Sequence, residues 1–132
     1  MSFVLPVPLL GRINAGMPAD SPEVREGEVY VTGKLVDRAD QKRLFALRVH
    51  GESMRELGIY DEDVVVVNPG AEARPGDIVV ALVNNETTVK SYFPLKGGRI
   101  ELRPANAEFS TQVYPANQVQ LQGRVIALQR EY

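Results

Sequence analysis

Short apolar runs separated by turn-forming residues dominate the hydrophobic pattern of this chain. Most are four to seven residues long and rich in β-branched residues, a pattern typical of strands rather than helices. They predict strands at 44–50, 64–67, 78–83, 87–93, 99–103 and 119–128, the last interrupted by a bulge at Gly123. Between them, 84–86 predicts a hairpin turn and 96–98 a second tight turn. The pattern indicates a mostly β fold, a small antiparallel β domain that is partly barrel-like.

The first part of the chain has a different composition. Residues 1–28 contain four prolines and three glycines, at Pro6, Pro8, Pro18, Pro22, Gly11, Gly16 and Gly27. Proline lacks a backbone N–H and glycine adds conformational freedom, so this stretch favours an extended segment over a regular element. We therefore expect an extended segment at 1–28 and a folded domain at 29–132.

Composition narrows the class of protein. A chain of 132 residues is expected to form one domain, and 44% hydrophobic with 24% charged residues is ordinary for a globular protein. The net charge of −2 argues against nucleic-acid binding by bulk electrostatics. No run approaches a membrane span, and the apolar start lacks the basic residues of a secretory signal, so we expect a cytoplasmic protein with no membrane partner. The absence of cysteine excludes disulfides and thiolate metal sites.

Ser53 is the first candidate for chemistry. The sequence Gly51-Glu52-Ser53-Met54 follows a predicted strand and opens a predicted short helical turn, where free backbone N–H groups could form an oxyanion hole. The same serine, with Glu56 three residues later, fits a capping box, and Gly58 is suited to end the turn. Taken alone, the local pattern favours the cap. The two hypotheses need the same backbone geometry, so the local pattern does not separate them.

A nucleophilic serine also needs a base. With one histidine and no cysteine in the chain, lysine is the remaining natural partner, and Lys90 lies in the predicted strand 87–93. Strand alternation places Thr88, Lys90 and Tyr92 on one face. Such a lysine is usually solvated and charged, whereas a catalytic one must be neutral, which requires an apolar setting without a carboxylate partner. The sequence alone does not show that environment.

Other polar groups point to simpler roles. His50 stands at a strand boundary three residues before Ser53, and we expect no catalytic role for it. The acidic group at 61–63 predicts a solvated turn rather than a metal site, since no second cluster of ligands accompanies it. Gly97-Gly98 predicts a hairpin turn and not a phosphate loop. We therefore expect neither a metal nor another cofactor.

An ordered set of motifs resembles the LexA/UmuD family of self-cleaving serine peptidases. The resemblance runs from Pro8 to Leu128, almost the whole chain, and each motif occurs in the order of the family. The matching segments are 8–18, 49–54, 58–63, 76–81, 88–90, 102–106 and 123–126. One such segment would be weak support, but the ordered set is specific.

The resemblance implies an activity and its residues. Ser53 would be the nucleophile and Lys90 its base, with the backbone N–H groups of Ser53 and Met54 as the oxyanion hole. The scissile bond would join Ala15 to Gly16, whose small side chains allow close approach of the backbone. The family resemblance also implies a homodimer whose cleavage is stimulated by the RecA filament on single-stranded DNA.

Three functions remain open at this point. LexA-type repressors carry an amino-terminal DNA-binding domain, yet only about ten residues precede the cleavage motif here. The chain would then be the peptidase part of an SOS-response repressor that contacts DNA only through an absent domain, or a standalone UmuD-like subunit of an error-prone translesion polymerase. Leu10-Gly11-Arg12 and the Ala–Gly bond favour the repressor, and the length favours the polymerase subunit. The third possibility is a non-catalytic dimerisation domain, which an intact Ser53 and Lys90 disfavour.

Overall fold

The computed structural model describes residues 4–11, 25–35, 43–70 and 72–132. In this part of the chain, nine strands form one sheet: β1 Val4–Leu10, β2 Arg25–Thr32, β3 Phe45–Arg48, β4 Val64–Asn68, β5 Ile78–Val83, β6 Glu86–Leu95, β7 Arg99–Arg103, β8 Gln112–Pro115 and β9 Val119–Gln129. Three short 3-10 helices lie within the described ranges: η2 Gly33–Leu35, η4 Arg55–Leu57 and η5 Ala116–Gln118. None of the helices in the described ranges is long and apolar enough to cross a membrane.

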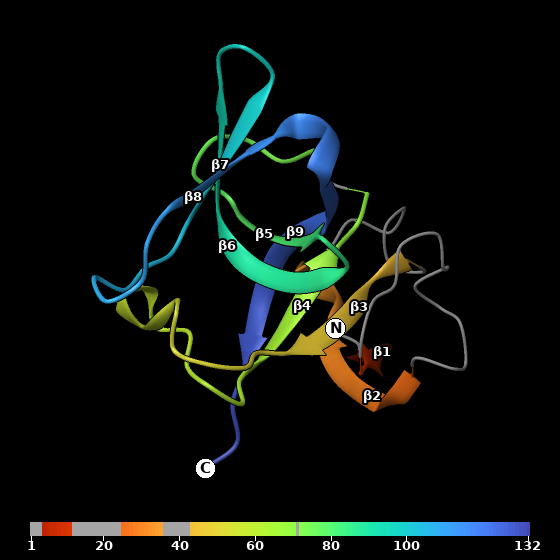
Figure 1. Ribbon diagram of the computed structural model, residues 1–132. Helices are drawn as coiled ribbons and strands as arrows, with labels where there is room; N and C mark the ends of the chain where they lie inside the picture. The colour runs from red at the N-terminus through yellow and green to blue at the C-terminus, as the bar shows by residue number, and fades with distance from the viewer. Residues whose placement is uncertain (1–3, 12–24, 36–42, 71) are drawn as a thin grey trace.

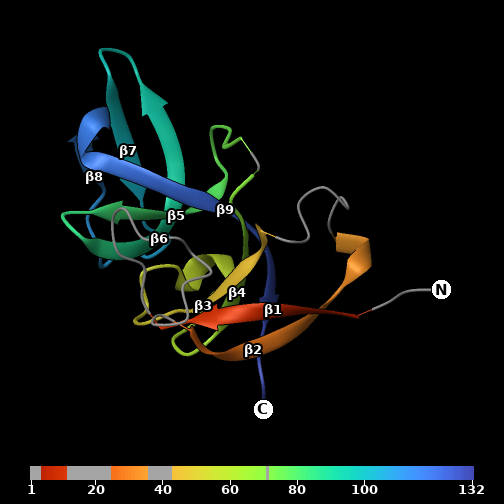
Figure 2. The same cartoon turned by 90° about the vertical axis from the view of Figure 1, so that its right-hand side faces the viewer.

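The strands follow the order β2-β1-β3-β4-β9-β5-β6-β7-β8, with β9 at the centre (Figures 1 and 2). Every pair is antiparallel except β1 with β3, which run parallel. The small, mostly antiparallel β domain is confirmed. The sheet does not close into a barrel, because β2 and β8 are its two edges within the described part of the chain.

The predicted strands are confirmed with small shifts at their ends. The hairpin between β5 and β6 pairs Val83 with Glu86, and its two turn residues, Asn84 and Asn85, have φ of 52° and 62°. Two positive φ values define a type I′ turn, which asparagine tolerates better than most residues. The bulge expected at Gly123 is confirmed by a register shift between β5 and β9.

Three strands were not predicted: β1, β2 and β8. The sequence pattern at 1–28 favoured an extended segment, yet β1 is a regular strand that pairs with both β2 and β3. Pro6 and Pro8 concealed it, since proline normally argues against an interior strand. The buried side chains of Val7, Leu9 and Leu10 hold β1 in place despite the prolines. The third, β8, is a short edge strand with mostly exposed residues.

The central apolar cluster lies where the two halves of the sheet meet and includes Met54, the residue directly after Ser53. Met54 is fully buried among side chains of β3, β4 and β5. Burial of a methionine side chain is worth about 1.5–3 kcal/mol, which anchors the turn carrying Ser53 against the sheet.

Candidate active site

The turn that carries Ser53 leaves β3 and leads into η4. Its N-cap is Met54, with no side-chain capping bond, so the predicted capping box at Ser53 is wrong. The Glu56 carboxylate, which the capping box required, instead accepts a hydrogen bond from the Ala107 N–H at 3.2 Å. Gly58 does end the turn in the left-handed region, with φ of 79°, as predicted. Since the hydroxyl of Ser53 caps no helix, it is free to take part in a different interaction.

A loop after β7 supports this turn from behind. The Ala105 N–H donates to the Ser53 carbonyl at 2.7 Å, and the Glu56 N–H donates to the Ala105 carbonyl at 2.7 Å. The side chain of Asn106 donates to the Glu52 carbonyl at 2.8 Å. These hydrogen bonds join segments about fifty positions apart in the sequence around the serine.

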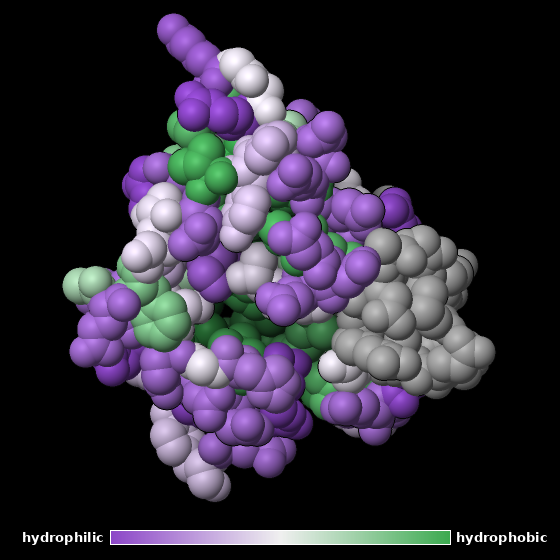
Figure 3. Space-filling view, viewed as in Figure 1, coloured by the Kyte–Doolittle hydropathy of each residue, from purple (hydrophilic) through white to green (hydrophobic). Residues whose placement is uncertain are grey.

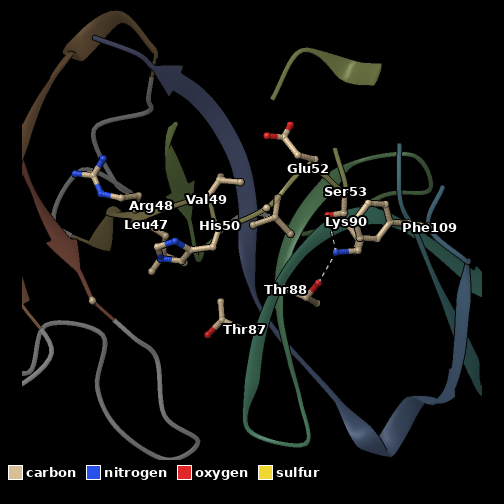
Figure 4. Close-up of a pocket in the computed structure, with 13 residues that line it drawn as sticks. Leu47, Arg48, Val49, His50, Glu52, Ser53, Thr87, Thr88, Lys90 and Phe109 are labelled. Carbon is tan, nitrogen blue, oxygen red and sulfur yellow. Dashed lines mark hydrogen bonds between the residues drawn. The ribbon is translucent and has the colours of Figure 1, made fainter. Parts of the chain in front are cut away.

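Lys90 reaches Ser53 from β6. Its Nζ donates to Ser53 Oγ at 3.0 Å and to Thr88 Oγ1 at 2.7 Å, and Figure 4 shows the three side chains converging. Thr88 stands two residues before Lys90 on the same face of β6, as strand alternation predicted. The structure therefore brings together the two residues that the sequence selected, although 37 positions separate them.

The environment of Lys90 suits a neutral amine. The side chain is half-buried, and burial lowers the pKa of Lys90 below its ordinary value because desolvation disfavours the charged form. Within the described part of the chain, no carboxylate forms an ion pair with Lys90. A lysine that is partly desolvated and has no carboxylate partner can, beside a serine hydroxyl, act as a proton acceptor.

The pair lies in a pocket of about 330 Å³. The end of β1 contributes Gly11, the β3 end and following turn contribute 47–53, β6 contributes 87–90, and the 104–109 loop contributes Phe109. Figure 3 shows a hollow near the middle of the molecule, with apolar side chains at its floor and polar residues around it. The volume of the pocket leaves room for a polypeptide segment to approach Ser53.

Phe109 is a site residue that the sequence did not indicate. It lies beside Lys90 in the pocket, although about half of its surface remains exposed. Its ring forms an apolar part of the wall of the pocket that holds the amine. Phe109 stands in an irregular polar stretch between Glu108 and Ser110, so no periodicity could have assigned it to the site.

His50 lines the rim of the pocket and lies apart from the Ser53–Lys90 pair (Figure 4). Its ring approaches Asp61 and Glu62, with the possible ligand atoms within 4.8 Å of one another. All three residues are exposed. Asp61 already accepts a hydrogen bond from the Gly51 N–H at 2.7 Å, and Glu62 lies 3.8 Å from Arg48. These contacts of Asp61 and Glu62 join the turn at 61–62 to the end of β3.

Asp63 departs from the solvated turn that the sequence predicted. It is buried and forms an ion pair with Arg130 at 2.7 Å, while the Tyr60 N–H donates to the same carboxylate at 2.7 Å. The hydrogen bond from Arg130 holds the pKa of Asp63 below its ordinary value, against the opposing effect of burial. The neighbouring Asp61 and Glu62 are exposed as predicted. Asp63 thus joins the turn after η4 to the C-terminal end of the chain.

The predicted cleavage bond, Ala15–Gly16, lies outside the described residues. The chain nevertheless leaves β1 at the pocket itself, because Gly11 follows Leu10 and lines the cavity. Ala15 lies four positions after Gly11 in the sequence. Fully extended, the chain between them spans at most about 14 Å.

A small β domain in which a serine hydroxyl accepts a hydrogen bond from a partly desolvated lysine has the arrangement of a serine hydrolase. The family model described as Peptidase S24-like matches residues 8–126, and the chain belongs to this family. Membership in a serine peptidase family agrees with the resemblance found in the sequence.

Several similar proteins carry the name LexA repressor. One from Erythrobacter litoralis is 43% identical over 129 residues, covering 98% of this chain and 54% of the relative. Two from strains of Cereibacter sphaeroides are each 44% identical over 129 residues, covering 97% of this chain and 56% or 55% of the relatives. The chain therefore spans about half the length of these relatives. The predicted relationship to the LexA/UmuD family is confirmed.

Proposed function

We propose that this chain is the self-cleaving serine peptidase domain of a LexA-like repressor and that it cuts its own Ala15–Gly16 bond. The observation that carries the proposal is the 3.0 Å hydrogen bond between Lys90 Nζ and Ser53 Oγ in a pocket that also receives the end of β1. A serine peptidase family supplies the reaction class, and the pair supplies a nucleophile and a base within hydrogen-bond reach.

The steps follow from the chemistry of the pair. Neutral Lys90 takes the proton of Ser53 as Oγ attacks the Ala15 carbonyl, and the N–H groups of Ser53 and Met54 stabilise the resulting oxyanion. Lys90 then returns the proton to the Gly16 nitrogen as the peptide bond breaks. Water hydrolyses the Ala15 ester, releasing the Ala15 carboxylate and restoring Ser53.

A tethered substrate makes the reaction sensitive to conformation. Because β1 ends at the pocket, a bond four positions beyond Gly11 is a tethered substrate, and tethering gives it a high effective concentration. Cleavage is then limited by how often the segment docks and how often Lys90 is neutral. We propose that the RecA filament on single-stranded DNA favours the docked state, a shift of population between two conformations.

The names of the relatives favour the repressor over the polymerase subunit. Their greater length allows for the DNA-binding part that the resemblance implies. In this proposal the protein is a cytoplasmic homodimer that contacts DNA through a domain outside the 132 residues, and cleavage separates that domain from the peptidase.

Incubation of the purified protein at alkaline pH tests self-cleavage. We expect mass spectrometry to detect a product that begins at Gly16, formed at a rate independent of protein concentration. The rate should rise with pH and then reach a plateau. The midpoint of this rise should lie below the pKa of a free lysine, about 10.4, because burial lowers the pKa of Lys90.

Two variants serve as controls for the mechanism. Ser53→Ala and Lys90→Ala should each abolish cleavage while melting cooperatively like the wild-type protein. Persistence of the intact wild-type chain, with and without an activated RecA filament, would count decisively against the peptidase. Cleavage retained by either variant would remove that residue from the mechanism.

A further inference from the structure

The loop after β7 holds two consecutive peptide groups at the Ser53 turn. Asn106 Nδ2 donates to the Glu52 carbonyl at 2.8 Å, and the Ala105 N–H donates to the Ser53 carbonyl at 2.7 Å. Both donors come from adjacent residues of one loop. The carbonyls of two successive peptide planes therefore both point toward the loop after β7.

This arrangement also sets the direction of two N–H groups. In a planar trans peptide the C=O and N–H bonds point in opposite directions, and no cis peptide occurs among the described residues. The N–H opposite the Glu52 carbonyl belongs to Ser53, and the N–H opposite the Ser53 carbonyl belongs to Met54. Both therefore point away from the loop, and within the described ranges neither donates a hydrogen bond to the protein.

The side chain of Asn106 is itself fixed. It is only 3% exposed, and its Oδ1 accepts a hydrogen bond from the Glu108 N–H at 3.0 Å. With Oδ1 engaged as an acceptor, the amide nitrogen is the atom that faces Glu52. Asn106 does not line the pocket, so it influences Ser53 only through the backbone.

We propose that Asn106 is a positioning residue that aims the N–H groups of Ser53 and Met54 at the carbonyl under attack. The assignment rests on the proposed function, since it concerns the oxyanion of that reaction. The carboxamide suits this role because it presents a donor to Glu52 and an acceptor to Glu108 at the same time. A carboxylate in its place would present an acceptor to the Glu52 carbonyl and disfavour this peptide orientation.

The Asn106→Asp variant tests the assignment through self-cleavage. We expect the plateau rate at alkaline pH to fall by at least about tenfold, since outright loss of an oxyanion donor costs about 10²–10³ in rate. The pH midpoint of Asn106→Ala should stay at the wild-type value, because Asn106 does not contact Lys90 and alanine introduces no charge near it. Asn106→Ala should also slow cleavage, and it provides the same comparison if the aspartate variant does not fold. Asn117→Ala, at an exposed asparagine of η5, is the matched control and should cleave at the wild-type rate.

A second measurement separates orientation of the amides from general loosening. The probe is a peptide boronic acid matching residues 12–15, with boron in place of the Ala15 carbonyl, which forms a tetrahedral adduct with Ser53. Asn106→Asp should weaken this adduct by a factor similar to the loss of rate. Binding of the planar peptide amide of the same sequence should change much less.

The outcomes distinguish the two proposals. If the wild-type protein neither cleaves nor forms the boronate adduct, the proposed function fails. If the wild-type protein cleaves and both Asn106 variants match its rate, the role of Asn106 is overturned and the peptidase stands. Equal loss of affinity for the boronic acid and the planar amide would also overturn the role, because it would show a change in docking rather than in oxyanion binding.

Discussion

At the scale of single residues, the protonation of Lys90 depends on the groups around its amine. Its amine has two hydroxyl partners, Ser53 and Thr88, and no carboxylate partner among the described residues. Partial burial lowers its pKa, whereas hydroxyl acceptors favour the protonated form. The balance between desolvation and these two hydrogen bonds decides how much neutral amine is present.

Replacement of Thr88 by valine should alter that balance in a measurable way. Thr88→Val keeps the shape of the side chain but removes the acceptor that holds Lys90 Nζ, so we expect the plateau rate of self-cleavage to fall about tenfold, equivalent to about 1.4 kcal/mol. The midpoint of the pH–rate profile should move to lower pH, because the protonated amine loses a hydrogen bond. Thr111→Val, at an exposed position, is the control. An unchanged rate and midpoint would show that Thr88 does not position Lys90.

The candidate pair was predictable from the sequence, and its surroundings were not. Ser53 and Lys90 stand in motifs whose order resembled a known family, but each looked ordinary locally. The burial of Asp63 escaped prediction because its partner, Arg130, lies 67 residues away. Contacts over such separations leave no local pattern.

At the scale of elements, β9 holds the two halves of the sheet together. It pairs with β4 on one side and β5 on the other, and its register shifts in both pairings. At Gly123 a side chain would meet Val67 Cγ1 at 2.7 Å and the Asn68 carbonyl oxygen at 2.8 Å. The bulge therefore depends on the absence of a side chain.

Gly123→Ala should destabilise the domain by about 2 kcal/mol, within the range of about 1–3 kcal/mol for overpacking a core. Urea unfolding would show a lower midpoint with an unchanged slope. Gly27→Ala is the control, because a methyl group there meets nothing within 4 Å. Equal stability of the two variants would contradict the steric argument.

Element prediction succeeded where the local pattern agreed with the tertiary setting. Strands β4 and β5 are apolar runs between turn signals, and β5 has the predicted bounds at 78–83. Strand β1 was missed because its two prolines carry the opposite local signal. Its stability comes from pairing with β2 and β3 and from burial, which only the assembled sheet provides.

At the scale of the whole molecule, Arg130 ties the end of β9 to the region just after η4. Its guanidinium bonds both oxygens of Asp63 and the Gly58 carbonyl, and it lies over the Tyr60 ring at 4.7 Å. A segment near the C-terminus thereby holds the segment that follows the candidate nucleophile. Loss of these contacts should therefore lower the stability of the whole domain.

Acid unfolding tests the contribution of Asp63. A carboxyl whose pKa is lower in the folded state stabilises the fold above its ordinary value of 3.8, and this stability is lost as the pH falls through the lower folded value. Between about pH 5 and about pH 2, the melting temperature of the wild-type protein should fall more steeply than that of Asp63→Asn. At neutral pH the variant should melt at the lower temperature. Glu86→Gln, at an exposed carboxylate, should follow the wild-type curve, and identical curves for Asp63→Asn and wild type would refute the role of the ion pair.

The position of β1 has a consequence for what cutting the chain achieves. This strand lies upstream of the proposed cut, yet it is inserted between β2 and β3, with Val7, Leu9 and Leu10 buried. Hydrolysis after Ala15 would leave those pairings intact, and the two pieces would remain together as a split protein. Their separation would require withdrawal of a strand from the interior of the sheet. The lifetime of the nicked complex would therefore be set by local unfolding of β1 rather than by hydrolysis.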